Sequence, residues 1–433
     1  MRSFVCLLTL FAAAAQVSAE NWPNWRGPLN NGISSEKNLP IEWGPDKNVA
    51  WKVELPGPAG ATPVVWGDRI FLTTTVKDPA ADPEKPMDAL LMAFSSDGKK
   101  LWEKFLGRGS VKPRGDEGNN PAAPSPLTDG KHVWTMLGTG DLACFDFDGK
   151  EIWKTDIEER YGKFEIQFGY TSTPVLDGDK LIIQLIHGLW NGEPQPAWIV
   201  ALDKNTGKEI WKHYRKSDAF DENVHSYASP VIYQDEQQKF LLAHGADYVT
   251  AHDLETGEEM WRCGGLNPKD NYNRFLRLVA SPSFNEGIIV VPSAKNGPIL
   301  GLKPNGQGDI TNDKSAQHWI RPRDTSDVPS PVIIDGIVYM VKENGVLIAM
   351  DAESGEQFYM ERIQDGRHRA SPVYADGHIY MTGREGQTSV IKVGKELEIV
   401  ARNTFGELQT ASPVISNGTI YMRTFNSLWA VRK

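Results

Sequence analysis

Apolar and polar residues alternate over short runs along most of the chain, and glycine-containing pairs separate one run from the next. In the stretch PSPVIIDGIVYMVKENGVLIAMDAESGEQF, the pairs Asp335-Gly336 and Asn344-Gly345 divide three such runs. Alternation over a few residues is typical of half-buried β-strands, and Asp-Gly or Asn-Gly pairs favour tight turns between antiparallel strands. The pattern therefore predicts a protein built from short antiparallel strands.

One of these turns recurs with a similar sequence around it. The segment ALDKNTGKEIW (201–211) combines a small residue, an aspartate, a Thr-Gly-Lys turn and a tryptophan. Similar segments end at Trp102, Trp153 and Trp261, and a degenerate copy ends at Phe358. We interpret the motif as the turn between the third and fourth strands of a repeated sheet, whose aromatic residue packs against the neighbouring sheet.

A second motif, Ser-Pro or Thr-Pro before an apolar run, alternates with the first. Its prolines are Pro63, Pro126, Pro174, Pro230, Pro282, Pro331, Pro372 and Pro413, spaced by 63, 48, 56, 52, 49, 41 and 41 residues. Repeats of roughly 40 to 50 residues with four short strands each indicate a β-propeller. A proline at the start of the first strand costs no ladder hydrogen bond. The sequence thus predicts an all-β, eight-bladed β-propeller of four-stranded blades.

The two ends of the chain complement each other in this scheme. The eighth repeat ends at Lys433 after its third strand, and the segment NVAWKVELPG around Trp51 has the pattern of the missing fourth strand. We expect the two to pair, because ring closure removes two exposed sheet edges. We assign residues 45–433 to a single propeller domain and residues 20–44 to an N-terminal leader.

The motif A-x-D-x-x-T-G-K-x-x-W resembles the tryptophan-docking repeat of the pyrroloquinoline quinone (PQQ)-like β-propellers, over about residues 45 to 433. The segment NWPNWRGPLNNGISSEKNLPIEW also resembles the leader of exported bacterial members. The family includes quinoprotein alcohol dehydrogenases and non-enzymatic scaffolds such as BamB, the propeller lipoprotein of the outer-membrane β-barrel assembly machinery. The resemblance implies the fold and does not decide between these functions.

The loops predict which face of the propeller binds something. Connections between blades (d–a) and loops between second and third strands (b–c) share one face. The insertions at 76–89, 105–123 and 187–197 fall on that face, whereas the turns on the other face are uniformly tight. Binding loops on a rigid scaffold usually concentrate in this way, so we expect the site on the d–a face near blades one to five.

Residues just before each Ser-Pro or Thr-Pro should surround the mouth of the central channel on this face. The candidate ligand-binding residues are Asn119, Asn120, Gln167, Tyr170, His225, Tyr227, Arg277, Asp327, Arg367, His368, Arg369 and Gln409. This polar, aromatic set of mixed charge suits a small anionic or polyhydroxylated ligand, and the alternative is a funnel that binds only water. The two histidines could sense pH or bind a metal, but no spaced motif accompanies them, and we assign no metal site.

The net charge restricts the possible binding partners, and the N-terminal residues indicate the location of the protein. The net charge of −10 argues against nonspecific binding to nucleic acid or to an anionic membrane. Residues 1–19 have the features of a signal peptide, with a basic start, a short apolar run and the cleavage sequence Val-Ser-Ala. The apolar run is too short to span a bilayer, and no later stretch reaches its length. We expect a monomer that is periplasmic or secreted after cleavage at Ala19, with no transmembrane segment.

The cysteines and acidic residues bear on the dehydrogenase hypothesis. Cys144 and Cys263 form no C-x-x-C, haem or adjacent-cysteine motif, and Cys144 stands where other repeats have alanine. Resemblance to the dehydrogenases would imply PQQ over an aromatic floor, calcium held by carboxylates and amides, and a covering disulfide of adjacent cysteines. The disulfide pair is missing. Residues that could offer oxygen ligands, without an ordering motif, are Glu117, Asn119, Asn120, Asp324 and Asp327.

Three functional hypotheses follow. We favour a non-enzymatic scaffold or ligand-binding protein without catalytic residues or a cofactor, whose partner is an envelope protein or a small polar ligand. The alternative is a dehydrogenase that depends on PQQ and calcium. A second alternative is a carbohydrate-binding module, because Trp190, Trp198, Tyr170 and Tyr227 could pack against sugar rings. The lipid-attachment cysteine usual in the assembly-factor branch is absent from the sequence.

Overall fold

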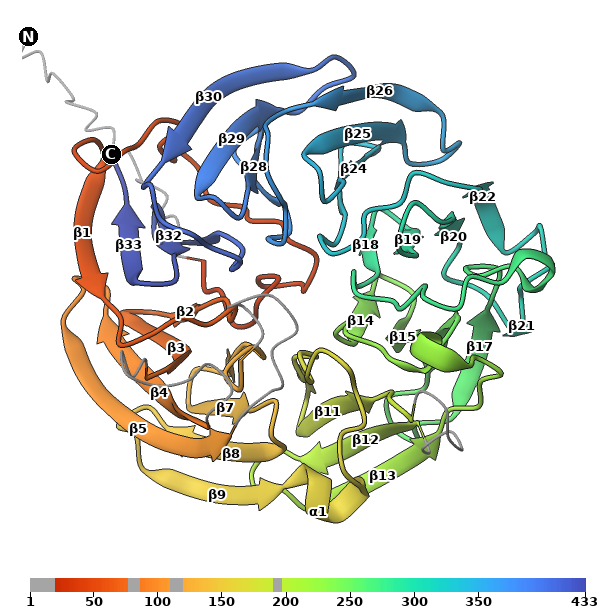
Figure 1. The fold of residues 1–433 in the computed structure, drawn as a ribbon, viewed down its shortest axis with the longest axis horizontal. Helices are drawn as coiled ribbons and strands as arrows, with labels where there is room; N and C mark the ends of the chain where they lie inside the picture. The colour runs from red at the N-terminus through yellow and green to blue at the C-terminus, as the bar shows by residue number, and fades with distance from the viewer. Residues whose placement is uncertain (1–19, 77–85, 110–119, 190–196) are drawn as a thin grey trace, which may run out of the picture.

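The strands form eight antiparallel sheets arranged as blades around a central channel (Figure 1). The computed structural model describes residues 20–76, 86–109, 120–189 and 197–433. Each blade has four strands, named a to d from the channel to the rim, and blade 4 gains a short fifth strand. The predicted eight-bladed, all-β propeller is confirmed.

The strands of blades 1 to 4 have the following bounds. They are β2 (Val64–Trp66), β3 (Arg69–Thr75), β4 (Met87–Ser95) and β5 (Lys100–Gly109); β6 (Leu127–Thr128), β7 (His132–Met136), β8 (Asp141–Asp146) and β9 (Glu151–Asp156); β10 (Val175–Asp177), β11 (Lys180–Leu185), β12 (Trp198–Asp203) and β13 (Glu209–Tyr214); β14 (Val231–Gln234), β15 (Lys239–Gly245), β16 (Tyr248–His252) and β17 (Glu259–Cys263), with β21 (Gly308–Asp309) added in parallel.

Blades 5 to 8 repeat the arrangement. They are β18 (Ser283–Asn285), β19 (Ile288–Pro292), β20 (Ile299–Leu302) and β22 (Gln317–Arg321); β23 (Val332–Ile334), β24 (Ile337–Val341), β25 (Val346–Asp351) and β26 (Gln357–Arg362); β27 (Val373–Ala375), β28 (His378–Thr382), β29 (Gln387–Lys392) and β30 (Glu398–Thr404); β31 (Val414–Ser416), β32 (Thr419–Arg423), β33 (Ser427–Val431) and β1 (Val49–Glu54).

A closed belt of hydrogen bonds encircles the channel where the a strands begin. In every blade, the backbone N–H of the Ser or Thr before the proline donates to the hydroxyl of its counterpart in the next blade. The eight pairs, 2.9 to 3.1 Å apart, are Thr62–Ser125, Ser125–Thr173, Thr173–Ser229, Ser229–Ser281, Ser281–Ser330, Ser330–Ser371, Ser371–Ser412 and Ser412–Thr62. This belt explains why a hydroxyl residue precedes each of the eight prolines.

Tryptophans of the d strands dock between blades, as the motif predicts. Trp211 donates its Nε1–H to the carbonyl of Leu254 at 3.2 Å, and its ring lies against Gly257 of the next blade. A side chain at Gly257 would place a Cβ 2.4 Å from that ring. The same pairing of a ring with a turn glycine and a carbonyl recurs at Trp51, Trp102, Trp153 and Trp319.

The ring closes at β1, as predicted. This strand pairs antiparallel with β33, with Trp51 opposite Ala430 and Val53 opposite Leu428. Trp51 also reaches blade 1, where its Nε1–H donates to the carbonyl of Ser96 at 2.9 Å. The N-terminal strand therefore completes the last blade and docks it on the first.

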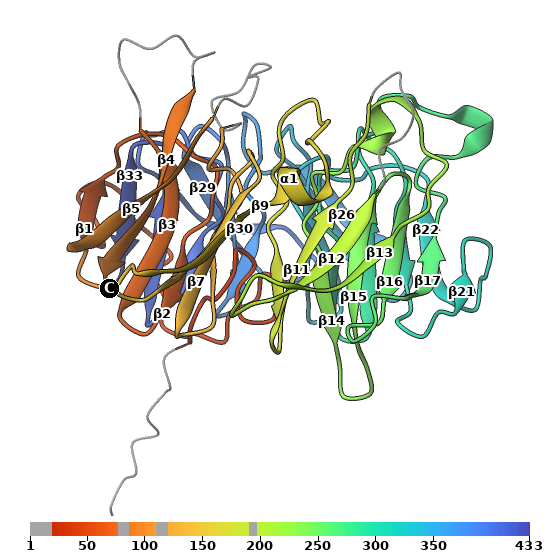
Figure 2. The ribbon, with the colours of Figure 1, turned by 90° about the horizontal axis from the view of Figure 1, so that it is seen from below.

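The leader that precedes β1 runs over the face of the a–b turns and reaches the centre of the ring (Figures 1 and 2), and several of its side chains are buried there. The backbone of Trp22 exchanges two hydrogen bonds with Val65 of β2, at 2.8 and 2.9 Å. Arg26 is 1% exposed, and its guanidinium donates to the carbonyls of Pro331 and Pro372. Burial lowers the pKa of Arg26 to about 9, so these carbonyls must offset a real desolvation cost. The leader is thus part of the core, a role that the sequence did not reveal.

Figure 2 shows the d–a connections and b–c loops on one face of the disc and the a–b turns on the other, as predicted. Three short helices lie in successive d–a connections: α1 (Ile157–Tyr161), η1 (Asp221–Val224) and η2 (Lys269–Asn271). The N-cap of α1 is Asp156, whose carboxylate accepts a hydrogen bond from the N–H of Glu159. Across the ranges described above, no helix combines the length and apolar character needed to cross a bilayer.

Candidate functional site

Two long connections rise from the d–a face over blades 4 and 5 (Figure 2). They contain η1, between blades 3 and 4, and η2, between blades 4 and 5. Neither connection repeats in the compact blades 6 to 8. They supply most of the residues that form the candidate site.

Four charged residues from four separate loops meet there, and we call them the charge cluster: Glu222, Arg277, Lys295 and Asp327. Glu222 is only 4% exposed, and its carboxylate lies 3.3 Å from Arg277 Nε and 3.9 Å from Lys295 Nζ. Asp327 accepts a hydrogen bond from the backbone N–H of Lys295 at 3.3 Å. Two acids and two bases give the charge cluster no net charge, and each acid contacts a group of Arg277 or Lys295.

Burial dominates the electrostatics of the charge cluster. It raises the pKa of Glu222, although the cations of Arg277 and Lys295 act in the opposite direction. Burial also lowers the pKa of Lys295, helped by the positive charge of Arg277. Glu222 is therefore shielded from water, whereas the side chain of Lys295 is 36% exposed and can meet a ligand that arrives from solvent.

Aromatic rings border the charge cluster. The guanidinium carbon of Arg277 lies 5.2 Å from the centre of the Phe168 ring, and Lys295 Nζ lies 5.7 Å from that of Phe275. The backbone N–H of Phe168 donates to the hydroxyl of Tyr227, whose ring is in edge contact with His225. The structure thus brings together four predicted residues: His225, Tyr227, Arg277 and Asp327.

Glu222 and Lys295 complete the charge cluster, and neither was predicted from the sequence. Glu222 lies in η1, three residues before His225, and Lys295 lies in the b–c loop of blade 5. The acidic pair that starts η1 was a usable signal, since it sits in an insertion on the expected face. Lys295 has no such signal, because its backbone adopts a left-handed conformation in an irregular loop.

The exposed aromatic residues also differ from the expected ones. Phe220 is 48% exposed and stacks on Tyr272, with 4.2 Å between ring centres, and Phe275 is 51% exposed. In contrast, Tyr170 and Tyr227 are buried. Trp198 packs edge-on against Tyr214, and Trp190 lies outside the described residues.

A second group of predicted residues lies over blades 6 to 8 and holds loops in place. Arg369 pairs with Glu343 at 3.1 Å. His368 is fully buried, accepts a hydrogen bond at Nε2 from the Gln364 amide at 2.8 Å, and has its pKa lowered by burial to about 4. The backbone carbonyl of Arg367 accepts from the N–H of Arg384. These contacts join neighbouring loops and leave the histidine neutral near pH 7.

The remaining predicted residues are not brought to one point. Asn120 bridges the carbonyl of Pro58 and the N–H of Ala122, and the Tyr170 hydroxyl donates to the carbonyl of Gln184. Gln167 is partly buried. The amide of Gln409 is 1% exposed and makes no side-chain hydrogen bond within the described part of the chain. Asn119 lies outside the described residues.

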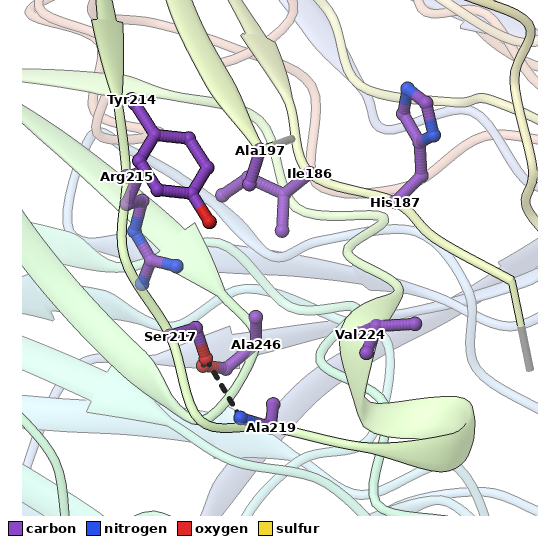
Figure 3. A pocket seen from close by; sticks show the side chains of 9 residues that line it. All are labelled: Ile186, His187, Ala197, Tyr214, Arg215, Ser217, Ala219, Val224 and Ala246. Atoms are coloured by element: carbon purple, nitrogen blue, oxygen red, sulfur yellow. Dashed lines mark hydrogen bonds between the residues drawn. The ribbon is translucent and has the colours of Figure 1, made fainter. Parts of the chain in front are cut away.

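A small cavity lies between blades 3 and 4 below the η1 connection (Figure 3). Its lining residues are Ile186, His187, Ala197, Tyr214, Arg215, Ser217, Ala219, Val224 and Ala246. Its volume of about 30 Å³ holds roughly one water molecule. Arg215 is buried there and donates to the carbonyls of Gly245 and Tyr248, at 2.8 and 2.7 Å. The cavity is too small for an organic ligand.

The described residues do not fit a calcium-bound quinone. No group of three or more His, Cys, Asp or Glu side chains is placed to hold a metal ion in the ranges that the structure describes. At the channel mouth Glu222 is already paired with cations of the chain. Cys144 and Cys263 are buried in blades 2 and 4, and burial raises the pKa of each thiol to about 12. They cannot form the covering disulfide and are unreactive core residues.

Comparison with known proteins places this chain among PQQ-like propellers. A family model described as outer membrane protein assembly factor BamB matches residues 87–360. A polyvinylalcohol dehydrogenase of a Pseudomonas species is 22% identical over 383 residues, which cover 80% of this chain and 52% of the relative. Another, from Sphingopyxis sp. (strain 113P3), is 25% identical over 210 residues, covering 46% and 29%. The chain spans about half the length of the first relative and less of the second.

Solved structures from both branches of the family share the fold. BamB from Moraxella catarrhalis gives a TM-score of 0.60 at 14% identity, covering 89% of this chain and 97% of that one. Quinohemoprotein alcohol dehydrogenase from Comamonas testosteroni gives 0.65 at 13%, covering 95% and 80%. A europium-containing methanol dehydrogenase gives 0.67 at 12%, covering 95% and 89%. At such identities the similarity establishes the architecture alone.

Proposed function

Because the chain belongs to the family of PQQ-like propellers whose model is described as outer membrane protein assembly factor BamB, we propose that it is an exported, non-enzymatic binding protein. Its ligand is a small polyhydroxylated molecule with an anionic group, bound on the d–a face over blades 4 and 5. The charge cluster beside exposed aromatic rings is the observation that carries this proposal.

The chemistry of the site supports this ligand class. Arg277 and Lys295 offer cations to a carboxylate or phosphate, and the low exposure of the Arg277 side chain, 15%, reduces the screening of such a contact by water. Glu222 and Asp327 can accept hydrogen bonds from hydroxyl groups. The exposed face of Phe275, next to Lys295, suits packing against a sugar ring.

Glucuronate, with glucose as the neutral comparison, tests the proposal. We expect saturating glucuronate to raise the melting temperature of the wild-type protein by a few degrees, since ligand at 100 times Kd stabilises by about 2.7 kcal/mol. Arg277→Gln should abolish the shift. Arg274→Gln should retain it, because Arg274 is solvent-exposed and pairs with Asp221 outside the charge cluster. No shift with the wild type, or equal shifts in both variants, would contradict the proposal.

The dehydrogenase remains a second candidate because of the 22% identity to a polyvinylalcohol dehydrogenase over 383 residues. It requires PQQ and calcium to bind this chain and an alcohol to be oxidised. Under our proposal, PQQ with calcium chloride leaves the melting temperature unchanged, and dye reduction with polyvinyl alcohol stays at background. A shift with PQQ together with dye reduction would establish the enzyme and reject the proposed function.

A further inference from the structure

The first described residues lie at the seam where the ring begins and ends. Glu20 accepts a hydrogen bond at its carbonyl from the Ser416 hydroxyl of blade 8, at 2.6 Å. Asn21 accepts from the N–H of Gly67 in blade 1, at 2.8 Å. Residues 20 and 21 therefore bridge the a–b turns of the last and first blades.

A buried carboxylate receives this end of the chain. Glu36 is 6% exposed, and its oxygens accept hydrogen bonds from the N–H groups of Asn417 and Gly418, at 2.9 and 3.0 Å. The third donor is the backbone nitrogen of Glu20, 3.0 Å from Oε1 of Glu36. Three N–H groups thus converge on one carboxylate.

The charge of Glu36 has no counter-ion in the described chain. Lys37, the next residue, pairs instead with Asp376 at 3.9 Å. The carboxylate of Glu20 is held by the hydroxyl groups of Ser34 and Ser35 and adds a second negative charge. A buried carboxylate without a cationic partner is costly, so a positive charge at this point would stabilise the fold.

The sequence offers such a charge at the nitrogen of Glu20, because the predicted cleavage sequence Val-Ser-Ala ends one residue before it. We propose that hydrolysis of the Ala19–Glu20 peptide bond makes the new α-ammonium of Glu20 the counter-ion of Glu36. Water adds across the amide, leaving the carboxylate on Ala19 and the ammonium on Glu20. Processing during export then tightens the seam between blades 8 and 1.

The proposed ion pair has a defined dependence on pH. An α-amino group has a pKa near 8 in an unfolded chain, and the contact with Glu36 raises it in the folded state. The stabilisation is therefore full below about pH 8 and disappears as pH rises through the folded value. The other charged groups on the adjoining elements are the Glu20 carboxylate and the Lys37–Asp376 and Arg69–Asp68 pairs.

The test compares the exported protein with a chain extended before Glu20 by Gly-Ser, and introduces Glu36→Gln into both. Intact mass should show that the exported protein starts at Glu20. At pH 7 we expect E36Q to lower the melting temperature of the exported form by about 2 °C more than that of the extended form. This difference should shrink by pH 10.

A matched control is Glu42→Gln, since Glu42 is solvent-exposed and pairs with Lys47. E42Q should lower the melting temperature of the exported and the extended form equally. If E36Q also lowers the melting temperature of both forms by the same amount, Glu36 merely caps a turn, and the proposal fails. A start other than Glu20 overturns it directly, and neither outcome depends on the ligand of the d–a face.

Discussion

At Gly257, the backbone conformation and the packing both require glycine. Its φ of +76° lies in the left-handed region, and the Trp211 ring occupies the space where a side chain would begin. The two requirements explain why glycine stands in the turns that receive Trp51, Trp102, Trp153, Trp211 and Trp319. Gly287 meets only the conformational requirement, because it has a φ of +78° but no atom lies within 4 Å of the position that a Cβ would take.

We predict that Gly257→Ala destabilises the protein by about 2 kcal/mol more than Gly287→Ala. In both variants, a residue with a Cβ in the left-handed conformation destabilises the fold by roughly 1–2 kcal/mol, and only Gly257→Ala also displaces a tryptophan ring. Thermal melting of both variants beside the wild type measures the difference. Equal losses would show that the ring tolerates a methyl group and that packing does not select glycine there.

At the scale of elements, the belt of hydroxyl groups links blades through side chains. Each a strand faces the channel, so its first residues cannot pair with another strand and would leave buried N–H groups unsatisfied. The hydroxyl of each Ser or Thr accepts a hydrogen bond from the corresponding N–H group of the blade before it. Thr62 and Thr173 show that either hydroxyl residue serves.

We predict that Thr173→Ala leaves the N–H of Ser125 without its acceptor and costs about 1–3 kcal/mol. Thr173→Ser keeps the hydroxyl and should cost less. Hydrogen exchange separates the two cases, because the amide of Ser125 should exchange faster in T173A and near the wild-type rate in T173S. Unchanged protection in T173A would mean that the belt contributes nothing at this position.

Across the propeller, histidines in both the strands and the connecting loops are buried. Burial lowers the pKa of His187 and His368 to about 4 and that of His244 and His252 to about 3. Unfolded histidine titrates near 6.5, so the unfolded chain binds more protons between these values. Stability is therefore full above about pH 6.5 and falls as pH decreases towards 4.

We predict a melting temperature that drops steeply between pH 7 and 4.5, and a shallower drop in His368→Gln. Glutamine at this position cannot gain the proton that the unfolded chain takes up. Melting curves across this pH range check both statements. A slope that is identical in H368Q and the wild type would exclude this histidine from the acid response.

The number of blades, the face of the loops and the strand that closes the ring could all be predicted from the sequence pattern. These features depend on local chemistry that repeats within each 40- to 60-residue unit: a turn, a hydroxyl-proline pair and an alternation of apolar residues. The pairing of Trp51 with blade 8 followed as well, because one strand was missing at one end and one was spare at the other. Repetition makes such signals readable without coordinates.

The residues that meet in the channel and in the candidate site could not be predicted from the sequence, because they come together through contacts between distant segments. Arg26 reaches carbonyls more than 300 positions away, and no periodicity marks a leader that reaches the centre of the ring. Glu222 and Lys295 meet Arg277 because three irregular loops fold over one another, and an irregular backbone directs its side chains by no fixed period. Regular elements follow from local sequence, whereas contacts between loops exist only once the ring has brought the blades together.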